Sequence, residues 1–375
     1  MAEFLTNTTD LTAVANAIRE KGGTSEQLAC PDGFVAAIQA IQTGVPLQIA
    51  VTTNAGATVT ATKGSKTVSG TADASGNCTL TVDEAGTWTV TVATASTTKT
   101  SDVVVGISNV DLPLVDSVLN NNSWETIKKV SDAGQGENYW SVGDRKAVTL
   151  NGTVGALTLS NVTTYVFIIG FNHNSSVEGT NRIHFQLAKT ALSGGTDVCF
   201  CDSKYSSNVF TTGYFSMNSS LTNSGGWARS QMRTNICGTS LSSYSGTIIA
   251  VIPEALRAVL KSVTKYTDNI AGGSAGISNI TATTDYFFLL SEYEVFGSIS
   301  YGNTNEKNKQ AQYAYYSAGN SKIKYKHDGT STAALWRLRS PCVRYSGYFV
   351  IVNVNGTVNA DGAYTSYGFA PGFCV

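Results

Sequence analysis

Residues 47–106 alternate between apolar and polar side chains so strictly that only short β-strands can bury the apolar set. The runs include Cys78-Thr-Leu-Thr-Val and Thr87-Trp-Thr-Val-Thr-Val, and they are separated at intervals of 6 to 10 residues by Gly64, Gly70, Gly76 and Gly86. Period-two strands joined by regular turns predict a β-sandwich of about seven strands. Such domains usually serve as spacers or stalks, and no chemical motif stands out in this one.

The segment before this domain predicts two short helices. Apolar residues recur at helical spacing from Leu11 to Ile18 and again from Phe34 to Ile41. Neither helix is long enough to be stable alone, so the segment must dock on another surface. That surface is either the next domain of the chain or a larger assembly, and the clean boundary at Gly44-Val45-Pro46 favours the assembly. We therefore expect residues 1–45 to form a helical attachment segment.

The composition limits the classes of partner. A chain of 375 residues is too long for one ordinary core, so two or three domains are expected. Only 14% of the residues are charged, and the chain is instead rich in Gly, Ser, Thr and Asn, with 17 Tyr. Adhesive surfaces have this composition, although many strands and turns would produce it equally well. The net charge of −1, without a basic block, argues against nucleic acid or an anionic membrane as a partner.

The N-terminus has neither a basic start nor an apolar run, so we expect no signal peptide and synthesis in a host cytoplasm. No apolar stretch is long enough for membrane insertion. The seven scattered cysteines fit reduced, buried thiols better than a disulfide framework. None of the three histidines (His173, His184 and His327) has a partner at the spacing of a metal site or a nucleophilic triad. We therefore expect no metal and no cofactor.

From residue 107 onward the aromatic content rises, and strands are mixed with one predicted helix, which begins at Pro253 and extends to about Val263. Asn355-Gly356 and Asp361-Gly362 predict two-residue hairpin turns near the end of the chain. This part is expected to form a domain of its own.

Glu292 and Glu294 lie two residues apart in a predicted core strand or helix start. In a strand they would share one face, about 6–7 Å apart at the Cα atoms, which could mimic the carboxylate pair of a glycosidase. An ion pair of either glutamate with Arg339 or Arg233 explains the same residues. We favour the structural interpretation and expect no catalytic residues.

Three stretches of the chain resemble known families. The string from Thr9 to Thr24, followed by Pro31-Asp-Gly-Phe-Val-Ala-Ala-Ile, is similar to the N-terminal module of tail and structural proteins in phages of Firmicutes. Residues 47–106 resemble bacterial immunoglobulin-like domains. Residues 110–375 resemble the DUF6273 family in landmarks such as Val142-Gly-Asp-Arg and Trp336-Arg-Leu-Arg-Ser-Pro. Ala370 departs from the arginine that is usual there. This last resemblance implies an α+β fold of the C-type-lectin-like kind.

In lectin-like folds the last strands and loops face the ligand, and the closing stretch from Val343 to Tyr367 is rich in tyrosine and asparagine. Tyrosine and arginine are common binding anchors, and flat aromatic rings stack on the apolar faces of sugars. Some of these tyrosines could equally complete the core of the last hairpins. The predicted ligand-binding residues are Arg344, Tyr345, Tyr348, Asn355, Tyr364 and Tyr367.

Together these features predict a mostly β multidomain chain with an attachment segment (1–45), an immunoglobulin-like spacer (46–106) and a C-type-lectin-like binding domain (107–375). We expect a phage tail protein that resides in the virion, contacts other virion proteins through residues 1–45 and binds a bacterial surface glycan or protein non-covalently. A homo-oligomer, most simply a trimer, would raise its avidity. The alternatives are a structural or decoration protein that does not bind a receptor, and a polysaccharide-degrading tailspike.

Overall fold

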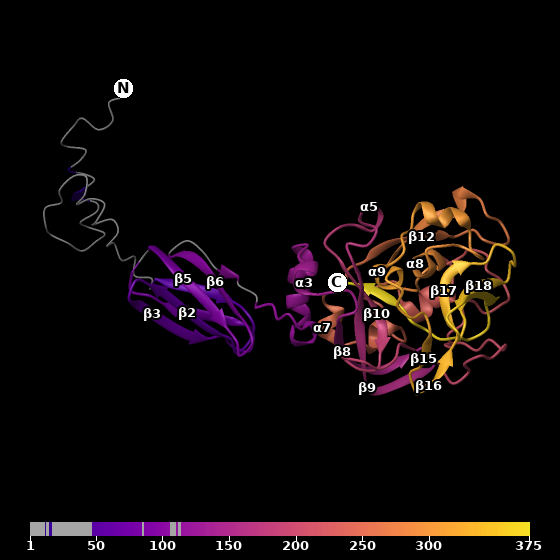
Figure 1. Ribbon diagram of the computed structural model, residues 1–375, viewed down its shortest axis with the longest axis horizontal. Coiled ribbons are helices and arrows are strands. Elements are labelled where there is room, and N and C mark those ends of the chain that lie inside the picture. Colours follow the sequence, from indigo (N-terminus) through magenta and orange to yellow (C-terminus); the bar gives the residue numbers. More distant parts are fainter. Residues whose placement is uncertain (1–11, 13–14, 17–46, 85, 106–109, 112–113) are drawn as a thin grey trace, which may run out of the picture. The chain divides into compact units, whose positions relative to one another are not determined.

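The computed structural model describes residues 12, 15–16, 47–84, 86–105, 110–111 and 114–375. The chain divides into two compact units, Met1–Val115 and Asp116–Val375. In Figure 1 the described residues of the first unit are coloured indigo to purple, and those of the second run from purple through orange to yellow. The helices predicted over residues 8–42 lie outside the described residues except at three positions. No helix in the described part of the chain is both long and apolar enough to cross a membrane.

The first unit is built from two β-sheets. Its described strands are β1 (Gln48–Thr52), β2 (Thr58–Lys63), β3 (Lys66–Thr71), β4 (Asn77–Thr81), β5 (Gly86–Ala93), β6 (Thr98–Val105) and β7 (Val110–Asp111). One sheet has the strand order β4-β1-β7 and the other has the order β3-β2-β5-β6. All pairs are antiparallel except that of β1 with β7.

The alternating sequence of the first unit explains its core. In β5 the side chains of Trp88, Val90 and Val92 are fully buried, while the intervening threonines face outward. These three residues join Ile49 and Leu80 of the other sheet in one hydrophobic cluster. Successive strand residues point to opposite faces, so a period of two places Trp88, Val90 and Val92 together on the core side. The predicted strand pattern is confirmed here.

The second unit contains short helices and several sheets. Its helical elements are η1 (Leu119–Asn121), α3 (Trp124–Asp132), α4 (Gly136–Tyr139), α5 (Ser175–Glu178), η2 (Met232–Cys237), α6 (Ile248–Val251), α7 (Glu254–Arg257), η3 (Ile277–Asn279), α8 (Glu292–Phe296), η4 (Thr304–Asn308) and α9 (Ala314–Ser317). Its strands are β8 (Arg145–Val154), β9 (Leu157–Phe171), β10 (Ile183–Lys189), β11 (Val198–Cys199), β12 (Val263–Asp268), β13 (Ile280–Asp285), β14 (Phe287–Phe288), β15 (Lys324–Lys326), β16 (Gly329–Ala334), β17 (Trp336–Pro341), β18 (Tyr348–Val352), β19 (Val358–Gly362) and β20 (Gly372–Cys374).

The largest sheet of this unit has the strand order β14-β20-β10-β9-β8, and β8, β9 and β10 can be followed in Figure 1. The last strand, β20, lies between β14 and β10, so the end of the chain is part of the core. A separate sheet of order β17-β18-β19 carries the closing hairpin. The described chain is therefore mostly β, as the sequence predicts.

Two local predictions in this unit are wrong. The helix expected from Pro253 to Val263 covers only α7, because Lys261 pairs with Cys374 of β20 and Val263 begins β12. Asp361-Gly362 lies within β19 and does not form a two-residue hairpin turn. Glu292 and Glu294 lie at the start of helix α8, which was one of the two alternatives for this stretch, and Ser291 and Glu294 form a reciprocal capping box there.

The hairpin signal at Asn355-Gly356 is confirmed in a longer form. Residues 353–357 connect β18 to β19, and Gly356 has a φ of +81°, which glycine adopts without strain. The Asn355 side chain accepts hydrogen bonds from the backbone N–H and the hydroxyl of Thr357. The six cysteines in the described part of the chain are buried thiols without disulfide bonds.

Candidate functional site

Exposed apolar and aromatic side chains gather where three loops of the second unit meet. Tyr345 is 55% exposed and Leu221 is 50% exposed, and Leu221 packs closely over Gly347 and Gly362. The Tyr345 ring lies 5.2 Å from that of Tyr348, measured between ring centroids. Ile270, which is 56% exposed, is carried by the neighbouring loop. We call these residues, together with Arg344, the tyrosine surface.

The fully buried side chain of Asn223 ties these loops together. Its amide nitrogen donates hydrogen bonds to the carbonyl oxygens of Cys342 (2.8 Å), Tyr345 (3.1 Å) and Tyr348 (2.8 Å). Its amide oxygen accepts a hydrogen bond from Gly272 N–H at 2.9 Å. One side chain therefore fixes the loop that carries Tyr345 and the loop that follows Ile270. A fixed loop loses little conformational entropy when a ligand binds.

Two buried carboxylates anchor the adjoining loops in the same way. Asp268 accepts hydrogen bonds from the backbone N–H groups of Ile270 (3.1 Å) and Ala271 (2.7 Å) and from the side-chain amide of Asn303 (2.7 Å). Glu292 accepts backbone hydrogen bonds from residues 300–302. Burial raises the pKa of Glu292, and these N–H groups and the charge of Arg344 partly offset that effect.

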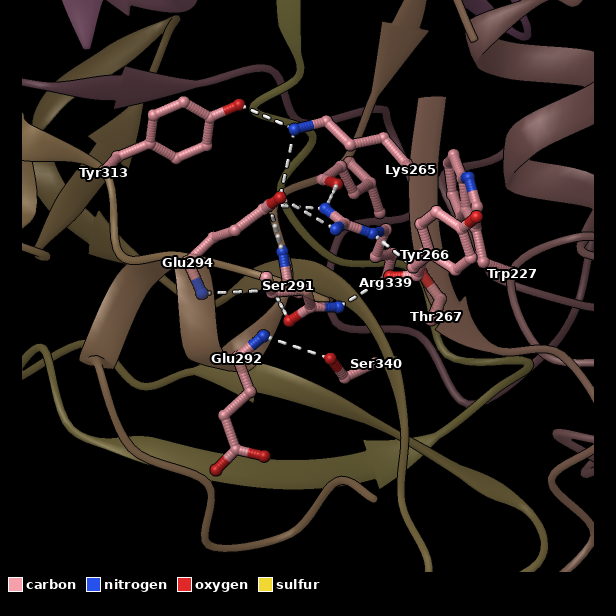
Figure 2. Close-up of polar contacts among 12 residues, drawn as sticks. Trp227, Lys265, Tyr266, Thr267, Ser291, Glu292, Glu294, Tyr313, Arg339 and Ser340 are labelled. Atoms are coloured by element: carbon pink, nitrogen blue, oxygen red, sulfur yellow. Dashed lines mark hydrogen bonds and ion pairs between the residues drawn. The ribbon is translucent and has the colours of Figure 1, made fainter. Parts of the chain in front are cut away.

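Glu294 lies in a different environment from Glu292, although only one residue separates them. Figure 2 shows its carboxylate between Lys265 and Arg339, with the carboxylate of Glu292 pointing away. Arg339 binds both oxygens of Glu294, one of them at 2.8 Å, and Lys265 Nζ lies 3.0 Å from Glu294 Oε1. Burial alone would raise the pKa of Glu294, but the two cations hold it well below its usual range.

The predicted structural ion pair with Arg339 is therefore confirmed for Glu294. Arg233, the other candidate partner, pairs instead with Asp285. The two glutamates are both fully buried and do not form a pair of carboxylates that faces a common site.

One group of side chains in the described residues has the spacing of a metal site. Ligand atoms of His173, Glu178 and Glu294 all lie within 4.8 Å of one another. However, the ammonium group of Lys265 lies 2.7 Å from Glu178 and 3.0 Å from Glu294, so it occupies the position of a cation between the two carboxylates. Burial, reinforced by the positive charge of Lys265, lowers the pKa of His173 to about 3. The cluster fits an internal ion-pair network better than it fits a metal.

The structure separates the six predicted ligand-binding residues. Arg344, Tyr345 and Asn355 are exposed, and Tyr348 and Tyr364 are half-buried. Tyr364 lies beside Gly362 near Leu221, so it adjoins the tyrosine surface. Asn355 belongs to the loop at the opposite end of β18, about 13 Å away along the strand.

Tyr367 does not belong to an exposed surface. It is only 7% exposed, its hydroxyl donates a hydrogen bond to Asp361, and the guanidinium of Arg337 lies 4.7 Å from the centre of its ring. Arg337 is fully buried and donates hydrogen bonds to the carbonyls of Gly362 and Thr365. Tyr367 therefore helps to complete the core of the last hairpin. A core role was the alternative to ligand binding for the tyrosines of the closing stretch.

Sequence reasoning missed Asn223, Asp268, Leu221 and Ile270. One signal was available in the glycine pair that follows Asn223. Gly226 has a φ of +53°, and a Cβ atom there would lie 1.9 Å from the carbonyl oxygen of Asp268. Only glycine allows these two loops to approach so closely. Nothing in the local sequence identifies the acceptors of Asn223, which lie 119 to 125 residues away.

Comparison with known families agrees in part with the resemblance noted for the C-terminal region. Residues 204–375 match the family described as "Domain of unknown function (DUF6273)". This match includes Asn223, Asp268, the buried ion pairs of Glu294 and the whole tyrosine surface. A search of curated proteins finds no match.

Glu306 provides a pH-dependent test of the buried network. Burial raises its pKa to about 7 from an ordinary value of 4.5, although it accepts hydrogen bonds from Asp268 N–H (3.0 Å) and Ser340 Oγ (2.7 Å). Between these pH values the folded state holds more protons than the unfolded state, so stability falls as the pH rises. Urea unfolding measures this effect. As the pH rises from about 5 to about 8, the free energy of unfolding of the wild-type protein should fall by on the order of 1–3 kcal/mol relative to that of Glu306→Gln.

The matched control for this experiment is Glu254→Gln, because Glu254 is exposed in α7 of the same unit. The difference in free energy of unfolding between Glu254→Gln and wild type should change by less than about 0.5 kcal/mol over the same pH range. A stability difference between wild type and Glu306→Gln that stays constant with pH would contradict the raised pKa of Glu306.

Proposed function

We propose that the chain is a tail-associated virion protein of a phage and that its C-terminal unit binds a bacterial surface glycan or protein non-covalently. The observation that carries the proposal is the exposed ring of Tyr345, held on a loop whose carbonyls are bound by buried Asn223. Aromatic side chains on rigid loops are strong anchors, since they bury a large area at a small entropic cost. The tyrosine surface is the proposed contact.

The proposed roles of the other parts follow from their chemistry. The two sheets of the first unit share one apolar core, which supports an immunoglobulin-like spacer. The short helices, the several sheets and the long ordered loops of the second unit support a C-type-lectin-like α+β fold. Residues 1–45, which lie almost entirely outside the described part of the chain, are proposed to attach to other virion proteins. Trimerisation would multiply a weak contact into stable attachment.

Binding is proposed to occur without bond cleavage. The carboxylate pair that could suggest a glycosidase is engaged within the protein, because Glu294 binds Arg339 and Lys265 while Glu292 accepts loop N–H groups. Both side chains are fully buried, so neither reaches a substrate in the described conformation. When cell envelopes are incubated with the protein, we expect them to retain their polysaccharide and to release no reducing sugar.

Substitution of the two clustered tyrosines tests the proposal. Fluorescently labelled full-length protein should bind a subset of a panel of Firmicutes cells, as measured by flow cytometry. Tyr345→Ala combined with Tyr348→Ala should weaken that binding at least about tenfold, because anchors of this kind contribute more than 1 kcal/mol each. The free energy of unfolding of Tyr345→Ala alone should change little, since the Tyr345 ring is mostly in solvent, whereas the double variant also loses the half-buried ring of Tyr348.

The matched control is Tyr139→Ala, which removes an exposed tyrosine of α4 in the same unit. This variant should bind like wild type. Equal binding by the double variant and wild type would refute the tyrosine surface as the contact. Incorporation into particles without binding to any cell would instead indicate a structural or decoration protein.

A further inference from the structure

A small hollow in the second unit lies apart from the tyrosine surface and has a different chemistry. It has a volume of about 160 Å³, and its walls come from residues 210–216 and from helix η2 with its N-cap. The side chains that define it are Phe210, Thr212, Tyr214, Ser216, Gln231 and Asn235. No lining side chain carries a charge. We infer that this hollow binds one neutral sugar ring, whether or not the tyrosine surface binds cells.

The combination of side chains fits a sugar better than other small ligands. A sugar ring has an apolar C–H face, which packs against an aromatic ring, and hydroxyl groups that both donate and accept hydrogen bonds. Tyr214 and Phe210 supply the rings, and the amides of Gln231 and Asn235 each supply donors and an acceptor. The absence of charge among the lining residues excludes selection of acidic or basic ligands. Pockets for drug-sized ligands are larger, at about 300–1,000 Å³, so the hollow suits a single ring.

The hydrogen bonds already made at the hollow leave complementary groups available. The amide nitrogen of Gln231 donates to Ser219 Oγ at 3.1 Å, while its amide oxygen has no partner among the described residues. The amide oxygen of Asn235 accepts from Thr234 Oγ1 at 3.0 Å, while its nitrogen has none among them. The oxygen of Gln231, which accepts, and the nitrogen of Asn235, which has two N–H donors, therefore remain for ligand hydroxyls. The Tyr214 hydroxyl accepts from Ser203 Oγ at 3.2 Å, so its own hydrogen can also be donated.

The backbone that presents the two amides is unusual. Residues Met232–Cys237 form a π-helix, of which Gln231 is the N-cap and Asn235 is a member. π-Helical segments are rare, and they occur frequently at functional sites. This second observation is independent of the composition of the hollow, and it concerns the element that carries both amides.

The walls of the hollow are fixed before any ligand binds. Gly213 accepts a hydrogen bond from Ala156 N–H at 2.8 Å, and Phe215 N–H donates to the buried carboxylate of Asp202 at 2.6 Å. Across the hollow, Gln231 N–H donates to the carbonyl of Met217 at 2.9 Å. A preformed site loses little free energy to ordering on binding.

A larger hollow of about 320 Å³, lined by residues 117–120, 143–145 and 192–194, lacks these features. It contains no aromatic ring, and the guanidinium of Arg145 already donates to the carbonyls of Ala191 and Gly194. The side-chain oxygens of Asn120 and Asp144 likewise accept backbone hydrogen bonds. The larger hollow is therefore a poorer candidate for sugar binding than the smaller one, despite its volume.

Saturation-transfer NMR with full-length protein tests the inference directly. The probes are glucose, galactose and N-acetylglucosamine, with glucuronic acid as a charged comparison. At least one neutral sugar should receive saturation on its ring C–H protons and bind with a Kd on the order of 1 mM, which is usual for a single small ring. The charged sugar should show no saturation. Tyr214→Ala should abolish the transfer, and Asn235→Asp should weaken binding at least about tenfold.

Control variants separate this site from the tyrosine surface and from misfolding. Tyr139→Ala, at an exposed tyrosine outside both sites, should leave sugar binding unchanged. The hollow is tested by saturation transfer with Asn235→Asp and the tyrosine surface by cell binding of the Tyr345 and Tyr348 double variant, so the two failures are distinguishable. Asn235 is exposed, so Asn235→Asp should retain the wild-type midpoint of thermal unfolding even if Tyr214→Ala does not fold. The inference is overturned if no neutral sugar is saturated, or if Asn235→Asp binds a sugar as tightly as wild type does.

Discussion

Replacing Arg339 with methionine should destabilise the second unit by about 3–5 kcal/mol. Arg339 is fully buried, and its guanidinium donates to both oxygens of Glu294, to Thr267 Oγ1 (2.8 Å) and to the carbonyl of Leu289 (2.8 Å). Methionine fills most of the volume but leaves Glu294 with only Lys265 as a cationic partner. Removal of one partner leaves a buried charge partly uncompensated, and this costs more than the intact pair contributes.

Urea unfolding followed by tryptophan fluorescence measures this effect, since four of the five tryptophans lie in the second unit. Arg229→Met, at an exposed arginine of the same unit, should change stability by less than about 0.5 kcal/mol. Adding Glu294→Gln to Arg339→Met should recover part of the loss, because the uncompensated charge is removed. A loss below about 1 kcal/mol for Arg339→Met would show that the network contributes little to stability.

Replacing Asn223 with leucine should cost at least about 2 kcal/mol and should also abolish binding through the tyrosine surface. Leucine has nearly the same size, but the carbonyl of Cys342 loses its donor and Gly272 N–H loses its acceptor. The carbonyls of Tyr345 and Tyr348 lose one of two donors and keep their backbone hydrogen bonds. Each buried polar group left without a partner costs about 1–3 kcal/mol. The loop that carries Tyr345 should then open locally, so that binding includes the entropic cost of ordering it.

Hydrogen exchange of the amides in residues 342–348 distinguishes this local effect from general destabilisation. Protection there should fall more than protection in β9 and β10 of the large sheet. Asn138→Leu, at an exposed asparagine of α4, should leave exchange, stability and cell binding close to wild type. If Asn223→Leu bound cells as tightly as wild type, the loop of residues 342–348, as held by Asn223, could not be the basis of recognition.

These predictions share one structural theme. The buried polar residues of the second unit fix the positions of exposed loops. Asn223 binds the loop that carries Tyr345, Asn223 and Asp268 both bind the loop of residues 270–272, and Glu292 binds residues 300–302. Glu294, Arg339 and Lys265 form the network beneath them. Stability and surface geometry are therefore coupled, and variants of the core should be compared for binding only after their unfolding has been measured.

Several features of the chain could be predicted because their cause is local. The alternation around Trp88 determines which side chains of β5 face the core, since strand geometry allows no other result. The need for a cation beside a buried glutamate was also predictable, and Arg339 was one of two candidates. The length of the helix after Pro253 was not, because β20 pairs with Lys261 from more than a hundred residues away.

The candidate site shows where local reasoning ends. Tyr345 and Tyr367 lie in the same tyrosine-rich stretch, yet one is mostly in solvent and the other is packed beneath Arg337. The amides of Gln231 and Asn235 became a candidate site only when residues 210–216 were folded against them. By itself the sequence determined the strand pattern and the chemical character of the closing stretch, because both depend on neighbouring residues. Only the tertiary structure decided which rings are exposed and which polar groups meet, because burial and long-range hydrogen bonds depend on segments distant in the chain.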